Sequence, residues 1–180
     1  KISERDIPAM KMAENSYSKE NKQLGSYTVQ QSIMKNDGSQ VGAKIATDDK
    51  AKSVMIGFSG THSVSDAKAD INGLKSRKID GLGSVHKGFY DEYSKVKPQM
   101  MQQVQQYANK GYKDFTITGH SLGGAEAIIA AAEIKKAYPN LNVRVVTAGS
   151  PALGNKEFVQ NYNNLGISTT RYVVCVFFIL

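Results

Sequence analysis

The sequence has no tryptophan, a single cysteine, and no apolar run as long as a membrane helix. No stretch reaches the ~18 apolar residues of a membrane span, and the apolar end, residues 173–180, is far too short. The single cysteine, Cys175, excludes a disulfide framework within the chain, and its apolar neighbours predict a buried packing thiol. No signal-peptide pattern follows Lys1, which leaves the compartment open.

The sequence also lacks long blocks of one charge, although its formal net charge is +7. Basic residues are interspersed with acids, as in residues 75–80, which predicts a solvated surface and no nucleic-acid partner. Length and composition suit one globular domain over residues 1–180, without an internal repeat or a low-complexity linker.

Hydrophobic spacing predicts strands that alternate with helices from residue 53 onward, and so a parallel sheet with crossover helices. Residues 36–39, Asn-Asp-Gly-Ser, predict a turn between two antiparallel strands. Strands are expected at residues 29–35, 40–46, 53–58, 115–118 and 143–147, and from 169 onward. Helices are expected at residues 3–17, 89–109 with a kink or a restart near Pro98, 124–138 and 155–164, and residues 64–78 form a weakly amphipathic stretch.

The strongest chemical signal is residues 119–123, Gly-His-Ser-Leu-Gly, with Ser121 at the centre. The pattern alone is weak, because chance gives about 0.06 matches of Gly-x-Ser-x-Gly in a chain of this length. Here a predicted strand runs into the motif and a predicted helix leaves it at once, which is the context of a nucleophile elbow. The glycines permit a very tight turn, and the helix N-terminus favours developing negative charge. The alternative is a glycine-rich turn that only packs.

Four stretches then follow one another in a recognisable order. They are residues 58–61 (Phe-Ser-Gly-Thr), 85–93 (Val-His-Lys-Gly-Phe-Tyr-Asp-Glu-Tyr), 118–124 (Thr-Gly-His-Ser-Leu-Gly-Gly) and 148–158 (Ala-Gly-Ser-Pro-Ala-Leu-Gly-Asn-Lys-Glu-Phe). Together, over about residues 53–173, they resemble the class 3 lipases, the fungal-lipase-like branch of the α/β hydrolases. Residues 171–173, Arg-Tyr-Val, resemble the strand that leads to the catalytic acid of that family.

The resemblance implies an α/β-hydrolase fold, a mostly parallel sheet with flanking helices and an N-terminal antiparallel hairpin. It also implies a lipase or esterase in which Ser121 attacks an acylglycerol or another carboxylic ester and carries the acyl group. Thr61 and the Leu122 N–H would form the oxyanion hole. Neither a metal nor another cofactor is implied, and secretion is consistent with the resemblance.

The sequence departs from the family in its triad. After Ser121 there is no histidine and no aspartate, although triads of this fold run serine, acid, histidine. The chain stops on the apolar run 174–180, so we expect a C-terminally truncated domain that lacks the acid and the base. His120 is expected to point away from Ser121 Oγ and His86 to pack at a helix start, which leaves His62 as the candidate surrogate base. Without a base, the chain should be nearly inactive.

Residues 64–74 occupy the place of the family's lid, a short amphipathic helix that commonly carries a tryptophan. Ala67 stands where that aromatic residue is usual. A lid that contacts a lipid surface and a solvated surface helix are therefore both open.

A second hypothesis comes from a different class of protein. It is a catalytically impaired hydrolase-like domain that binds acyl chains or a protein partner. The four motifs favour the enzyme, whereas the absent base favours the binding domain for this chain. An aspartate followed by a histidine in the sequence encoded beyond Leu180 would decide for the enzyme.

The apolar C-terminus predicts self-association. Burying an apolar side chain contributes ~1.5–3 kcal/mol, and an unpaired strand edge readily pairs with another chain. We therefore expect a dimer or aggregate through residues 173–180, detected by light scattering and abolished by Phe178→Lys with Leu180→Lys. A monomer at high concentration, with Cys175 open to thiol reagents, would contradict this prediction.

Overall fold

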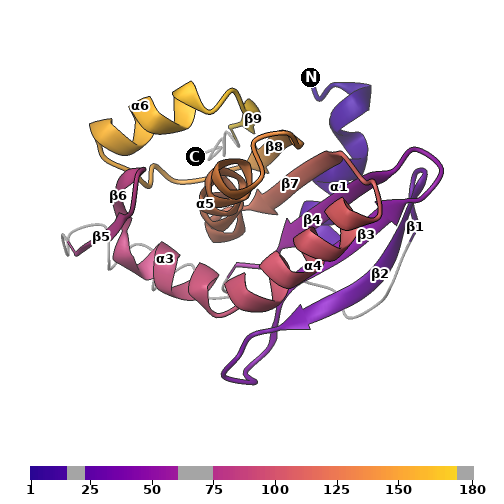
Figure 1. The fold of residues 1–180 in the computed structure, drawn as a ribbon, viewed down its shortest axis with the longest axis horizontal. Helices are drawn as coiled ribbons and strands as arrows, with labels where there is room; N and C mark the ends of the chain where they lie inside the picture. The colour runs from indigo at the N-terminus through magenta and orange to yellow at the C-terminus, as the bar shows by residue number, and fades with distance from the viewer. Residues whose placement is uncertain (16–22, 61–74, 174–180) are drawn as a thin grey trace, which may run out of the picture.

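The computed structural model describes residues 1–15, 23–60 and 75–173, and Figure 1 shows how they are arranged. Its larger sheet has seven strands in the order β1-β2-β3-β4-β7-β8-β9. These strands are β1 (Gln23–Leu24), β2 (Tyr27–Met34), β3 (Val41–Asp48), β4 (Ser53–Phe58), β7 (Asp114–His120), β8 (Asn142–Ala148) and β9 (Ser168–Tyr172).

The sheet joins an antiparallel part to a parallel part at β4. Strands β1 to β4 pair antiparallel in turn, whereas β4, β7, β8 and β9 run parallel. The predicted hairpin is therefore confirmed, with Val29 opposite Ala46. Its turn is stabilised by the Asp37 carboxylate, which accepts the Ser39 N–H at 2.9 Å.

Strands in the middle of the sheet are buried on both faces, as their continuous apolar runs predict. All six residues of β4 are buried. Met55 packs with Met12 of α1 (Ile7–Asn15) on one face, whereas Ile56 belongs to the core beside α5 (Leu122–Ala137) on the other. That second core also takes side chains from α3 (Lys87–Ser94), α4 (Lys97–Asn109) and α6 (Lys156–Asn164).

Capping residues set where the helices begin and end. Pro98 lies in the first turn of α4, where its missing N–H leaves no hydrogen bond unmade. Of the two alternatives expected near Pro98, the restart is confirmed, since α3 ends at Ser94 and α4 begins at Lys97. The Asn155 side chain accepts the Phe158 N–H at 2.9 Å and caps α6. At the N-terminus, a 3₁₀ turn (Glu4–Asp6) precedes α1.

Residues 76–79 differ from the expectation. The amphipathic pattern runs at helical spacing toward residue 78, but β5 (Ser76–Ile79) is a strand paired antiparallel with β6 (Gly83–His86). Gly81 makes the turn between them with a φ of +71°. The Arg77 guanidinium lies 4.9 Å from the centre of the Tyr90 ring, a cation–π contact that holds the strand against α3. Residues 64–74, with Ala67, lie outside the described residues.

The last described strand confirms one part of the expectation for the C-terminus. β9 pairs parallel with β8, with Thr169 opposite Val145. Cys175 and the rest of residues 174–180, on which the predicted self-association depends, lie outside the described residues. Among the described helices, none is long and apolar enough to cross a membrane.

A partly buried ion pair ties the N-terminal segment to the parallel strands. Asp6 is 5% exposed, and its carboxylate accepts hydrogen bonds from the Arg144 guanidinium of β8 and from the Tyr172 hydroxyl of β9, the latter at 2.6 Å. Removing one member of such a pair leaves the other charge poorly solvated, which costs more free energy than the intact pair contributes.

We expect Asp6→Ala to lower the free energy of unfolding by about 3 kcal/mol, because Arg144 loses its counter-ion and Tyr172 its acceptor. Urea unfolding of the variant and the parent measures the difference. Asp91→Ala is the matched control, since Asp91 and Lys87 pair with both side chains more than 40% exposed, and its effect should be about 0.5 kcal/mol or less. Equal losses in the two variants would contradict this account.

Candidate active site

The parallel strands bring three chain segments to one edge of the sheet. β4 ends at Phe58, β7 at His120 and β8 at Ala148. Phe58 lies opposite Gly119, and His120 lies opposite Ala148, so these strands end nearly in register. Ligands of open α/β sheets bind outside the carboxyl ends of the strands, and a site is therefore expected at this edge.

Ser121 lies at this edge with a backbone conformation that residues other than glycine rarely adopt. Its φ is +54° and its ψ is −119°. Its N–H donates to the Ala148 carbonyl at 2.8 Å, which anchors the turn to the neighbouring strand. A side chain in such a region costs of order 1–3 kcal/mol and persists where the surrounding structure enforces it. This conformation at the end of a parallel strand agrees with the very tight turn that the sequence predicts.

Glycines on both sides of Ser121 allow the chain to turn back on itself. A Cβ on Gly119 would lie 2.1 Å from the Gly123 carbonyl oxygen, and a Cβ on Gly123 would lie 2.3 Å from that of Phe58. Real Cβ atoms essentially never come under 3.0 Å. Neither position can therefore carry a side chain, and the predicted tight turn depends on both glycines.

Helix α5 begins directly after Ser121 and directs its N-terminus at this edge. Leu122 is its first residue, and an N–H in the first turn of a helix has no carbonyl partner within that helix. Both Leu122 and Ser121 are half-buried, so a small molecule can approach them. The N–H groups of this first turn and the positive end of the helix dipole favour an anionic oxygen near Leu122.

The loop after β4 packs against the first turn of α5. Besides the Phe58 carbonyl, the Gly60 nitrogen lies 3.2 Å from the position of a Cβ on Gly123. The Ser59 N–H donates to the Gly42 carbonyl at 3.0 Å, and Gly60 takes a φ of +66°. Residues 58–60 are thus beside the elbow, as the oxyanion assignment requires. Thr61 and His62, which were expected to supply an oxyanion donor and a surrogate base, lie outside the described residues.

The other two histidines have separate surroundings. His86 precedes α3, and its Nδ1 accepts the Gly88 N–H at 3.1 Å while its ring stacks on Phe89. Its predicted packing at a helix start is confirmed. His120 is exposed at the end of β7. Among the described residues, no group of three or more His, Cys, Asp or Glu side chains could hold a metal ion.

Glu126 is a carboxyl group that the sequence reasoning did not assign to the site. It lies on α5 one turn after Leu122, is 3% exposed, and takes a hydrogen bond from the Gly60 N–H. Burial raises the pKa of Glu126 to about 8, so the carboxyl is mainly neutral at pH 7. The signal in the sequence is a single carboxylate among the apolar residues 125–131.

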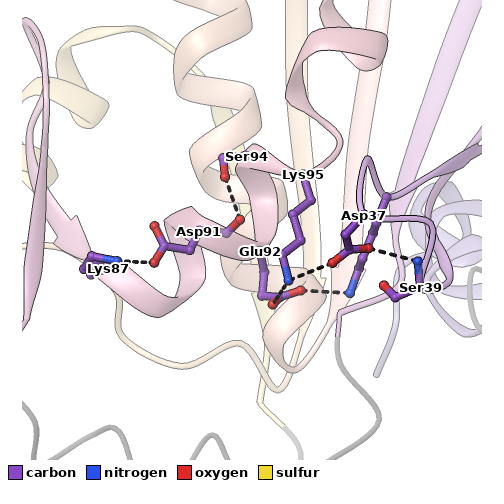
Figure 2. A network of polar contacts seen from close by, with 8 residues as sticks. Asp37, Ser39, Lys87, Asp91, Glu92, Ser94 and Lys95 are labelled. Atoms are coloured by element: carbon purple, nitrogen blue, oxygen red, sulfur yellow. Dashed lines mark hydrogen bonds and ion pairs between the residues drawn. The ribbon is translucent and has the colours of Figure 1, made fainter.

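Lys35, Asp37, Glu92 and Lys95 form a cluster of charged side chains, three of which (Lys35, Glu92 and Lys95) act electrostatically on Glu126. Lys35 is 4% exposed and binds Glu92 at 2.8 Å; Lys95 binds Glu92 at 2.8 Å and Asp37 at 3.3 Å (Figure 2). Burial acts to raise the pKa of Glu92, but the hydrogen bonds from Lys35 and Lys95 outweigh it, and the net shift is downward. Glu92 is therefore ionised where Glu126 is neutral.

The comparison with known families settles which family this architecture belongs to. The family model described as lipase (class 3) matches residues 55–176, more than half of the chain. The chain belongs to the class 3 lipases. Among curated relatives, a lipase of Rhizopus niveus is 33% identical over 142 residues, which cover 75% of this chain and 36% of that protein. The secreted mono- and diacylglycerol lipase 1 of Fusarium solani is 34% identical over 126 residues, 68% of this chain and 36% of that protein.

Solved structures agree with the family assignment. The chain superposes on the triacylglyceride lipase of Rhizomucor miehei with a TM-score of 0.71 at 26% identity, covering 82% of this chain and 57% of that one. The fold is thus that of the α/β hydrolases. This class 3 lipase chain spans only about a third of the length of the curated relatives that it matches.

Glu126→Gln should change how the free energy of unfolding depends on pH. A pKa near 8 in the folded chain, against an ordinary 4.5, means that the folded state holds an extra proton between these values. The stabilisation from this group is complete below pH 4.5 and is lost as the pH rises toward 8, by at most about 1.4 kcal/mol per pH unit. Denaturant unfolding from pH 5 to 9 should show a shallower decline in Glu126→Gln. Equal slopes in the variant and the parent would contradict this prediction.

Proposed function

We propose that this class 3 lipase chain carries the nucleophile half of a carboxylic-ester hydrolase that works through a Ser121 acyl-enzyme. The observation that carries the proposal is the strained Ser121 backbone, at the end of β7 and directly before the N-terminus of α5. That arrangement is the strand–turn–helix context of a nucleophile elbow.

In the proposed reaction, Ser121 Oγ attacks the ester carbonyl carbon and gives up its proton to a base, which then protonates the departing alcohol oxygen. The negative charge that develops on the carbonyl oxygen is stabilised by the Leu122 N–H and by Thr61, the proposed oxyanion donors. The intermediate collapses with loss of the alcohol, and water then hydrolyses the acyl-enzyme. Loss of the base costs ~10⁶ in turnover in a serine protease that shares this logic, so the proton acceptor is critical. Within this chain His62 is the candidate surrogate base.

The proposed substrates are acylglycerols or other carboxylic esters. Relatives are named as lipases and as a mono- and diacylglycerol lipase, and one similar fungal lipase structure is described as a model for interfacial activation. We extend contact with a lipid surface to this protein on that basis. The relatives do not favour a non-catalytic domain. The proposal includes neither a cofactor nor a nucleic-acid partner, takes residues 1–180 as one domain, and keeps self-association through residues 173–180.

A p-nitrophenyl phosphonate should attach slowly to Ser121, one adduct per chain, because the elbow places one half-buried, strained serine at the N-terminus of α5. Peptide mass spectrometry after several hours at pH 8 locates the adduct. Ser121→Ala should prevent it, whereas Ser150→Ala, which changes a serine on the neighbouring segment, should not. A folded chain that takes up no phosphonate, or takes it up elsewhere, would refute the proposal.

Turnover of short p-nitrophenyl esters should stay close to background in this chain and change little in Ser121→Ala, since no histidine follows the nucleophile. Initial rates with p-nitrophenyl butyrate measure this. High turnover that Ser121→Ala abolishes would reveal a base within the chain, and His62→Ala would then identify it.

A further inference from the structure

Glu126 connects two parts of the candidate site. It lies four residues after Leu122 on α5, and residues at this spacing share one face of a helix. Its carboxyl takes the N–H of Gly60, which belongs to the loop between β4 and the proposed oxyanion residue Thr61. The side chain therefore spans from the helix that carries one proposed oxyanion donor to the loop that leads to the other.

The position is an unfavourable one for a carboxyl group. Glu126 is 3% exposed, its neighbours Ala125 and Ala127 are fully buried, and its Oε2 atom has no hydrogen-bond partner among the described residues. An apolar residue would pack there without any desolvation cost. The Gly60 N–H would then lose its acceptor in a buried loop. The hydrogen bond to Gly60 is thus what a carboxyl group provides at this position and an apolar residue does not.

We propose that Glu126 is a positioning residue of the Ser121 site: it holds the Gly60 N–H and thereby fixes the loop of residues 58–60 against the first turn of α5. The inference rests on the proposed function for its catalytic consequence, but the contact itself does not. Loop position matters because oxyanion donors act only at about 3 Å from the developing charge, and a displacement near 1 Å costs roughly 100-fold in rate.

The charge on Glu126 decides whether this arrangement helps or hinders catalysis. A neutral carboxyl accepts the Gly60 N–H without opposing the oxyanion, whereas a carboxylate one turn from Leu122 would repel it. The charged groups that act on Glu126 are Lys35 after β2, Glu92 of α3 and Lys95 after α3, and these are already paired with one another. Burial keeps the pKa of Glu126 near 8 despite the two lysines.

Amide hydrogen exchange at Gly60 tests the contact without any catalysis. Glu126→Leu, which removes the acceptor but suits an apolar site, should speed exchange of the Gly60 amide about tenfold. Glu126→Gln keeps an acceptor oxygen and should leave the rate within about threefold. Glu133→Gln is the matched control, because Glu133 is a largely buried carboxylate on the same helix that binds Tyr93 and Lys97 instead. Equal Gly60 exchange in Glu126→Leu and the parent overturns the proposal.

Phosphonylation of Ser121 as a function of pH tests the consequence for the site. At pH 7, Glu126→Leu should react about 10- to 100-fold more slowly than the parent, and Glu126→Gln should restore most of the rate. Serine ionisation should make the phosphonylation rate rise with pH. Above pH 8 the rate of the parent should rise less steeply than this, because Glu126 becomes charged, whereas the rate of Glu126→Gln should follow the full rise. This comparison uses only the parent and Glu126→Gln, so it still tests the proposal if Glu126→Leu fails to fold. A parent and Gln variant with identical profiles overturn the charge argument. If the parent is never labelled, the proposed function is refuted. Amide exchange at Gly60 then still shows whether Glu126 holds the Gly60 N–H.

Discussion

The backbone contact between the ends of β4 and β7 and the first turn of α5 is the constraint on which the rest of the site depends. Gly119 and Gly123 leave no space for a Cβ, so α5 starts as close to the sheet as main-chain atoms permit. This approach requires the positive φ of Ser121, and it brings the Phe58–Gly60 loop into contact with the helix. A side chain at either glycine would separate strand, helix and loop together, because all three share one contact.

The elbow and the strands around it could be predicted because their signals are local. Two glycines at fixed spacing around Ser121, a buried run before it and a helical run after it define the turn without any tertiary information. The Asn-Asp-Gly-Ser turn defines the hairpin in the same way. Strand β5 was not predicted, because residues 76–79 are exposed except at Ile79 and so carry no two-residue alternation of apolar side chains.

Features that depend on contacts between distant segments could not be predicted. Glu126 looks like a surface carboxylate on an alanine-rich helix, and it is buried only in the folded chain, where Gly60 and Glu92 lie near it. Asp6 is separated by 138 residues from Arg144, so no spacing rule relates the two. The roles of Thr61 and His62 stay predictions, since both residues lie outside the described part of the chain.

Burial and hydrogen bonding explain why the buried Glu126 and the half-buried Glu92 adopt opposite charge states. Glu92 has ammonium donors on both oxygens, from Lys35 and Lys95, and these repay its desolvation. Glu126 has one backbone donor, the Gly60 N–H, and this single hydrogen bond does not offset the desolvation of a charged carboxylate. The charges of Lys35 and Lys95 are therefore balanced by Glu92 and Asp37, and the proposed oxyanion site would depend mainly on backbone N–H groups and the dipole of α5. Such dipoles are fixed by the fold and need no reorganisation when charge develops, which makes the position of the Phe58–Gly60 loop decisive.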